Sequence, residues 1–335
     1  MSGRPGRRLF RWLGGTALAL ALLAGLGAWQ AERLYREPGP LAAPAQLVIP
    51  RGGAEQIAAR LAEAGVIESP HAFLAAVWWT RAAGPLRAAE FAFPAGASLA
   101  QVLDILRTAR PVQRRLTIPE GLTARQILAL VEGAEGLIGP AALPPEGSIL
   151  PQTYAYQWGD DRVGLMRRAE LAMTAALTEA WSQRAEGLPL ASPREALILA
   201  SIIERETGLA EERPRVAAVF LNRLRRGMPL QADSTVAYAA AGGGVLDRRL
   251  TRADLELDSP FNTYRNRGLP PAPIASPGLA ALRAVMRPAE SDELYFVADG
   301  NGGHAFARTL EEHNRNVARW REVERRRAEP PPVIR

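Results

Sequence analysis

Residues 192–208, SPREALILASIIERETG, predict a complete buried helix. Ser192 is a favourable N-cap, the proline after it suits the first helical position, and Glu195 completes a capping box. Gly208 is expected to end the helix in the left-handed conformation. The run 196–203 between these signals is apolar apart from one serine. A helix that is apolar on every face is normally buried in the core of a larger domain.

Glu204 stands near the end of this helix, on the face that carries Leu197, Ala200 and Ser201. Glu206 points about 200° away at about 100° per residue, so the two acids cannot form a pair from this helix alone. The small residues leave room beside Glu204 for a substrate or another backbone. Burial should raise the pKa of such a carboxyl group, as a general acid requires. The alternative, an ion pair with one of the many arginines, stays open at this point.

Composition excludes several classes of site. The chain has 335 residues, enough for two domains, and no cysteine, so disulfides and thiol chemistry are excluded. Its three histidines are scattered, and we expect neither a metal nor a cofactor. The net charge is +6, and all the basic residues are arginine. This charge suits an anionic membrane surface or an acidic polymer. No basic run is interleaved with aromatics, so we expect no nucleic-acid partner.

The N-terminus has the pattern of a membrane anchor. Residues 1–11 carry four arginines, and 12–29 form a run without charge. This run would span about 27 Å as a helix, enough for a bilayer core, with Trp12 and Trp29 at the two interfaces. A cleaved signal peptide is the rival interpretation. We expect an uncleaved anchor with the N-terminus inside, followed by a tether over 30–45.

Three segments share one pattern, in which an apolar run is followed by Pro-x-Gly and an amphipathic stretch. They are LVIPRGGAEQIAARL from Leu47, FAFPAGASLAQVLDIL from Phe91 and LTIPEGLTARQILALV from Leu116. Each predicts a strand, a turn and a helix. The first copy, with the following VIESPHAFLAAV, resembles the LysM-like module of envelope proteins. That resemblance implies binding of glycans that contain N-acetylglucosamine.

The second half of the chain predicts further helices and a hairpin around a long loop. The Pro-rich segment 258–278 is long enough to suggest a functional loop. The other expected elements are a helix from Pro214 to near Gly227, a helix over 235–241 capped by Ser234, a helix over 279–286, a strand over 294–298, a turn at 301–304 and a helix from Thr309.

Several long motifs in this half resemble the YceG-like family, whose members are membrane-anchored endolytic murein transglycosylases. The motifs are IIERETG, RVAAVFLNRLRRGMPLQADSTVAY, FNTY, GLPPAPI, LYFVADGNGGHAF and EHN, and the resemblance covers about 47–320. It implies that Glu204 is the catalytic acid. The chain departs from the family pattern at Gln152, where the family commonly has Asp, and at Ser234, where it commonly has Pro. We therefore assign Gln152 no chemical role.

The resemblance implies a reaction that needs one acid. Glu204 would protonate the leaving oxygen and then take the proton from the C6 hydroxyl of the same muramic acid, whose attack on C1 leaves a 1,6-anhydro end. The candidates for substrate binding are Gln231, Asn262, Thr263 and Tyr264. For 262–264, turn structure alone is the alternative. Asp233 is expected to have a structural role.

The resulting hypothesis is a peptidoglycan lytic transglycosylase, a lyase, in the cell inner membrane with its catalytic domain in the periplasm. Its expected partners are peptidoglycan strands, the membrane and peptidoglycan synthases, and strand termination is its expected role. The alternatives are a murein-binding scaffold without activity and a muramidase that uses Glu204, Asp233 and water. The expected fold is α+β: 1–11 cytoplasmic, 12–29 transmembrane helix, 30–45 tether, 46–112 LysM-like module, 113–325 mostly helical lysozyme-like catalytic domain with a small sheet, and 326–335 disordered tail.

Overall fold

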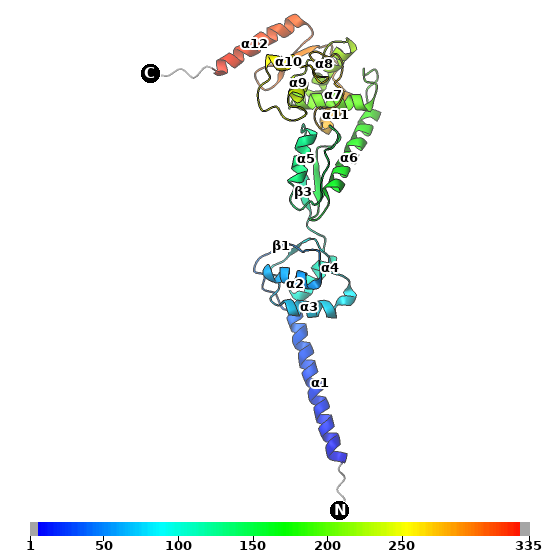
Figure 1. The fold of residues 1–335 in the computed structure, drawn as a ribbon, viewed down its shortest axis with the longest axis vertical. Helices are drawn as coiled ribbons and strands as arrows, with labels where there is room; N and C mark the ends of the chain where they lie inside the picture. The colour runs from blue at the N-terminus through cyan, green and yellow to red at the C-terminus, as the bar shows by residue number, and fades with distance from the viewer. Residues whose placement is uncertain (1–5, 329–335) are drawn as a thin grey trace, which may run out of the picture. The chain divides into compact units, whose positions relative to one another are not determined.

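The computed structural model describes residues 6–328, with side chains for residue 18 and for 20–327 (Figure 1). The chain divides into two compact units. The first unit is Met1–Arg114 with Gln157–Gly159, and the second unit is Arg115–Tyr156 with Asp160–Arg335. Helices and short two-stranded sheets make up both units, which confirms the expected α+β class.

The first unit is built from two of the three repeated segments. Its β1 pairs antiparallel with β2, with Leu47 opposite Phe91. Helices α2, α3 and α4 bury their apolar faces against this pair, around fully buried Phe73 and Phe91. The hydroxyl of Ser69 caps α3 by accepting the N–H of Ala72 at 3.3 Å. The elements are α1 (Gly6–Arg36), β1 (Ala45–Val48), α2 (Ala54–Glu63), α3 (Pro70–Trp79), a 3-10 turn (Arg81–Ala83), β2 (Glu90–Phe93) and α4 (Leu99–Thr108).

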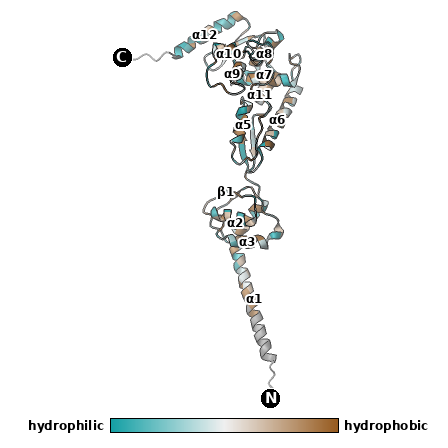
Figure 2. Ribbon diagram, viewed as in Figure 1, coloured by the Kyte–Doolittle hydropathy of each residue, from teal (hydrophilic) through white to brown (hydrophobic). Residues whose placement is uncertain are grey.

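The expected membrane span, 12–29, falls within α1. The side chains of 12–17 and of residue 19 lie outside those that the structure describes. Among the described residues, no helix has an apolar stretch long enough to cross a membrane. The described part of α1 changes from apolar to polar toward its C-terminal end (Figure 2). The expected cytoplasmic segment 1–11 lies partly outside the described residues.

The second unit surrounds the helix predicted from 192–208. Helix α7 packs against α6, α8, α9 and α11 (Figure 1), and its Leu199, Ile202 and Ile203 are fully buried. The prediction of a buried helix is therefore confirmed. Strand β3 pairs with β4, and β5 pairs antiparallel with β6. The elements are β3 (Arg114–Thr117), α5 (Ala124–Glu132), β4 (Thr153–Tyr156), α6 (Arg162–Ser182), α7 (Pro193–Glu206), α8 (Arg213–Arg225), α9 (Asp233–Ala240), α10 (Arg252–Leu255), α11 (Leu279–Met286), β5 (Tyr295–Ala298), β6 (His304–Ala307) and α12 (Leu310–Ala328).

The N-terminal cap of α7 is confirmed, but the predicted end of the helix is wrong. The hydroxyl of Ser192 accepts the N–H of Glu195 at 3.3 Å, and Glu195 reaches back to the N–H of residue 191. Gly208 does not adopt a positive φ. The helix ends instead at Glu206, and its C-cap, Thr207, has an extended backbone at φ −140°. The Thr207 hydroxyl accepts the N–H of Leu209 at 3.1 Å, and this local turn ends the helix without a left-handed residue.

Two other local predictions need correction. Helix α9 begins at Asp233, and Ser234 does not cap it, because its hydroxyl donates to Glu206. Residues 326–328, predicted to be part of a disordered tail, continue α12, while 329–335 lie outside the described residues. The three strand–turn–helix segments, the helix over 279–286 and the hairpin at 301–304 are confirmed.

Candidate active site

Glu204 lies at the end of α7 with both carboxylate oxygens engaged. Its side chain is 4% exposed. Arg213 donates to Oε1 at 3.0 Å, and the backbone N–H of Gly278 donates to Oε2 at 2.8 Å. One turn earlier on the same face, the Ser201 hydroxyl accepts the N–H of Ile274 at 3.0 Å. The small residues of this face therefore receive the backbone of the long loop, one of the two possibilities that the sequence left open.

Two turns of the chain frame Glu204 closely. Gly278 is the N-cap of α11, and a Cβ there would meet the carboxylate of Glu120 at 1.7 Å. Gly121 has φ +76°, and a Cβ at this position would lie 3.8 Å from the Glu204 side chain. The N–H of Gly121 donates to the carbonyl of Ser276 at 2.9 Å, which ties the two turns together. Gly121 suits its position because of its left-handed backbone, whereas a side chain at Gly278 would displace the carboxylate of Glu120.

Burial sets the protonation of Glu204. Desolvation raises the pKa of its carboxyl group, and the charge of Glu120 raises it further. The N–H of Gly278 and the guanidinium of Arg213 act in the opposite direction without cancelling the rise. Glu204 thus pairs with an arginine and still has the raised pKa that a general acid requires. The two interpretations of this residue are compatible.

Arg213 is held in place from the β5–β6 hairpin. The preceding residue, Glu212, accepts the backbone N–H of His304 at 2.9 Å and lies 2.6 Å from the Nδ1 atom of its ring. A Cβ at Gly303 would approach Glu212 Oε1 to 2.8 Å, so a side chain there would displace this carboxylate. This contact fixes the start of α8, where Arg213 is the first residue. Nothing in the sequence pattern alone pointed to a role for Arg213, Glu212 or His304.

Glu206 belongs to a second cluster. The Ser234 hydroxyl donates to Glu206 at 2.6 Å, and burial raises the pKa of Glu206, with Asp233 adding to the rise. The Tyr264 hydroxyl donates to Asp233 at 2.6 Å. Glu206 and Glu204 therefore have separate partners, as their angular separation on the helix predicted.

Asn262 and Thr263, two of the candidates for substrate binding, are buried in the turn before Tyr264. The Asn262 amide donates to two backbone carbonyls, and its oxygen accepts the N–H of Tyr264. The Thr263 hydroxyl accepts the N–H of Ala232 at 3.0 Å and bonds the hydroxyl of Thr235 at 2.9 Å. These hydrogen bonds fix the turn and the start of α9.

Gln231 and Tyr264, the other two candidates, lie on either side of this turn. Gln231 has φ 50°, in the left-handed region that side-chain-bearing residues rarely adopt. Its backbone N–H donates to the carbonyl of Thr263 at 3.1 Å, and Arg223 donates to its side chain at 3.4 Å. Backbone strain of this kind is common at functional sites. The structure therefore brings Gln231, Thr263, Tyr264 and Asp233 together.

The described side chains of residues 18–327 contain no group of three or more His, Asp or Glu that could hold a metal ion.

Comparison with known proteins agrees with the motifs quoted above from the second half of the sequence. The YceG-like family matches residues 47–319. The endolytic murein transglycosylase of Bacillus subtilis (strain 168) is 41% identical over 172 residues, covering 51% of this chain and 47% of the relative. The enzyme of the same name from Streptococcus pneumoniae (strain D39) is 37% identical over 180 residues, covering 52% of this chain and 32% of the relative. The matches thus span about half of one relative and a third of the other.

A solved structure also resembles the chain. The crystal structure of a YceG-like protein from Listeria monocytogenes is similar with a TM-score of 0.52 and 28% sequence identity. The similarity covers 82% of this chain and 99% of that one.

Proposed function

We propose, since this chain belongs to the YceG-like family, that it is an endolytic murein transglycosylase, which cuts within the glycan strands of peptidoglycan. The observation that carries the proposal is Glu204, a buried acid whose pKa is raised and whose two oxygens are held by Arg213 and Gly278. The Bacillus subtilis relative, which is 41% identical over 172 residues, bears that name.

In the proposed reaction, Glu204 donates its proton to the oxygen that leaves C1 of N-acetylmuramic acid. Its raised pKa keeps that proton on the carboxyl group closer to neutral pH. Arg213 then stabilises the carboxylate that proton donation leaves behind, through its bond to Oε1. The burial that raises the pKa of Glu204 favours the first step, which needs the protonated acid. Arg213 favours the second step, which needs the carboxylate.

The carboxylate next acts as base. It takes the proton of the C6 hydroxyl on the same sugar while that oxygen bonds to C1, which closes a 1,6-anhydro ring. No water is consumed, and Glu204 ends protonated as it began. The nucleophile is already attached to the reacting sugar, so its effective concentration is high.

Gln231 and Tyr264 are the residues that we propose contact the substrate. Their polar side chains flank the start of α9, and the left-handed backbone of Gln231 supports a functional role. Asn262 and Thr263 would hold these two residues in position, because their own hydrogen bonds are spent on the turn.

Mass spectrometry of products from uncrosslinked glycan strands tests the function. We expect internal cuts that leave 1,6-anhydro ends, and none with Glu204→Gln. Reducing muramic acid ends would indicate a muramidase that uses water. Terminal disaccharides alone would exclude the endolytic activity, and the absence of any product would leave a murein-binding scaffold.

We also propose that 12–29 anchors the protein in the inner membrane, with the residues after it in the periplasm and the LysM-like module on peptidoglycan. In support, the run is uncharged, and the described side chains within it are exposed, including Leu18, Leu22 and Trp29. Placed there, the enzyme would meet new strands from peptidoglycan synthases and end their elongation. Resistance of the full chain to carbonate extraction tests the anchor, and release into the soluble fraction would contradict it.

A further inference from the structure

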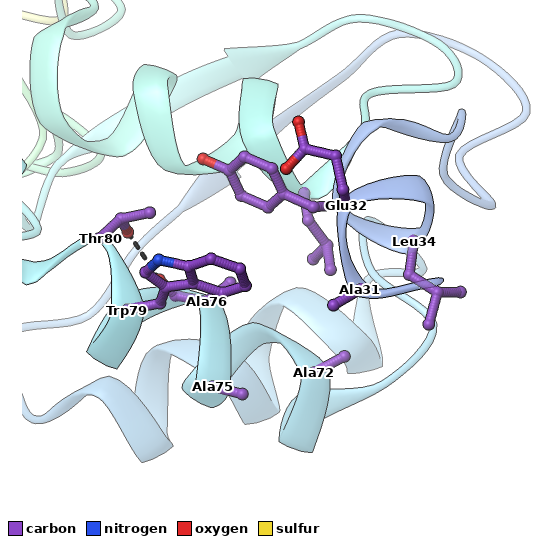
Figure 3. Close-up of a pocket in the computed structure, with 10 residues that line it drawn as sticks. Ala31, Glu32, Leu34, Ala72, Ala75, Ala76, Trp79 and Thr80 are labelled. Atoms are coloured by element: carbon purple, nitrogen blue, oxygen red, sulfur yellow. Dashed lines mark hydrogen bonds between the residues drawn. The ribbon is translucent and has the colours of Figure 1, made fainter. Parts of the chain in front are cut away.

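The first unit contains an apolar pocket of about 380 Å³ between the last turns of α1 and helix α3. Ala31 and Leu34 of α1 face Ala72, Ala75 and Trp79 of α3 across it (Figure 3). Alanines make up much of the wall, which leaves a groove wide enough for a slender apolar group. An apolar opening of this kind on a protein surface usually marks a site where a ligand or another apolar surface binds.

Two polar side chains of the lining, Glu32 and Thr80, are already engaged within the chain, and the other two, Tyr35 and Trp79, present mostly aromatic ring. Glu32 accepts a hydrogen bond from Arg36. The Thr80 hydroxyl donates to the carbonyl of Ala76 at 2.6 Å and accepts from Arg107 at 2.9 Å. A sugar site needs converging donors and acceptors for hydroxyl groups. This lining therefore favours a hydrocarbon chain over a glycan.

Exposed aromatic and cationic side chains lie at the end of α3 and in the 3-10 turn after it, next in sequence to the lining residues Trp79 and Thr80. Trp78 is 69% exposed and Trp79 is 64% exposed. The guanidinium of Arg81 lies 4.7 Å from the centre of the Trp78 ring. Tryptophan beside arginine is typical of proteins at the membrane–water interface, where the ring sits among headgroups and the cation meets lipid phosphate.

The position of the pocket along α1 agrees with this environment. Its α1 residues, Ala31 to Tyr35, follow directly on Trp29, the end of the uncharged run. Six residues of helix rise about 9 Å. The headgroup layer extends roughly 5–8 Å beyond the hydrocarbon core on each side. If 12–29 crosses the bilayer, the pocket opens at the depth of the headgroups.

We propose that this pocket takes an acyl chain of a bilayer phospholipid, and that Trp78, Trp79 and Arg81 seat the first unit on the membrane surface. The inference rests on the proposed anchor. The first unit is then held against the bilayer by two contacts, α1 and the tip of α3, and does not swing freely on a tether.

The absence of cysteine from the chain makes a clean test possible. Single cysteines replace Trp79, Gln46 on β1, or Leu20 in α1, and each carries the same environment-sensitive fluorophore. The full-length protein is placed in nanodiscs of phosphatidylcholine and phosphatidylglycerol that contain a nitroxide-labelled acyl chain. We expect the lipid nitroxide to quench the label at 79, while a water-soluble quencher acts mainly on the label at 46, an exposed position of the same unit.

The label at Leu20 distinguishes failure of the proposed membrane anchor from failure of the proposed contact between the first unit and the bilayer. Lipid quenching at 20 but not at 79 would overturn the seating and leave the anchor intact, whereas no quenching at 20 would refute the anchor and the seating with it. Protection at 79 by soluble glycan strands, without lipid quenching, would mark a sugar surface and overturn the proposal. Protection at 79 that depends on a second protein copy per disc would overturn it in favour of a dimer.

A charge in the pocket wall provides a second variant. Leu34 is 52% exposed, so Leu34→Glu should fold normally, and it should lose most of the lipid quenching at 79. Leu171→Glu is the matched control, since Leu171 is 59% exposed on α6 of the second unit. Equal quenching in both variants would contradict the proposal.

Discussion

Replacing Arg213 by glutamine should raise the pKa of Glu204 and move the pH dependence of glycan cleavage. Arg213 donates to Glu204 at 3.0 Å, and its side chain is only 11% exposed, so solvent screens this pair weakly. An opposite charge at this range typically lowers the pKa of a carboxyl group by about 1–3 units. Without it, desolvation and Glu120 act on Glu204 opposed only by the Gly278 N–H.

The sign of the change follows from the role of the acid. The reaction starts from protonated Glu204, so activity declines as pH rises through its pKa. The alkaline limb in Arg213→Gln should therefore lie about 1–3 pH units higher than in the parent. The maximal rate should fall, because the carboxylate formed by proton donation loses its cationic partner. Each unit of pKa corresponds to about 1.4 kcal/mol of lost anion stabilisation.

The assay is the initial rate of strand cleavage between about pH 4 and about pH 9, a range that starts near the ordinary pKa of a glutamate carboxyl group and extends above it. Arg215→Gln is the matched control, because Arg215 lies on the same helix but pairs with Glu293 at the surface. An alkaline limb that stays in place in Arg213→Gln, or that moves equally in both variants, would refute the assignment of Glu204 as the acid under the control of Arg213.

Three further predictions concern other parts of the chain. Glu204→Gln should abolish cleavage while the thermal midpoint stays near that of the parent; cleavage at the parent rate would remove Glu204 from the mechanism. Glu206→Gln should cost less activity. It should also flatten the pH dependence of stability: the native pKa of Glu206 is raised above 4.5, so the folded state binds more protons and stability falls as pH rises from about 4.5 through the raised value. Thermal midpoints of the parent and of Glu206→Gln, measured across this pH range, test this. Equal slopes of the midpoint against pH in the two proteins would show that Glu206 is not the cause. A fragment covering 44–110 should sediment with insoluble cell-wall sacculi without cutting them, and sedimentation no greater than background would reduce this module to a spacer.

The sequence predicted the features that depend on local pattern. Periodicity placed α7 in the core and put Glu204 and Glu206 on different faces, because both follow from the helical repeat alone. The end of the helix was mispredicted at Gly208, because a side-chain hydroxyl on Thr207 could form the turn that glycine usually provides. The family resemblance, rather than the pattern of residues, singled out 262–264.

The partners of Glu204 could not be predicted in the same way. Nothing local distinguishes Arg213 from the other basic residues of the chain, and the N–H of Gly278 is a backbone group that sequence does not mark. The pKa of Glu204 depends on both, and on Glu120 from a third segment. The sequence could indicate which residue carries the proton, but its environment comes from tertiary contacts.

The third repeated segment, which begins at Leu116, contributes residues to the surroundings of Glu204. Its turn supplies Glu120 and Gly121, which meet Glu204 and the N-terminal end of α11. In the first unit the same strand–turn–helix form builds only a core around β1 and β2. One structural unit thus appears in two settings, and in the second its turn lies against the acid. Glu120 lies 3.6 Å from the guanidinium of Arg213, and its charge raises the pKa of Glu204. Glu120→Gln should therefore lower the pKa of Glu204 and move the alkaline limb to lower pH, in the direction opposite to Arg213→Gln.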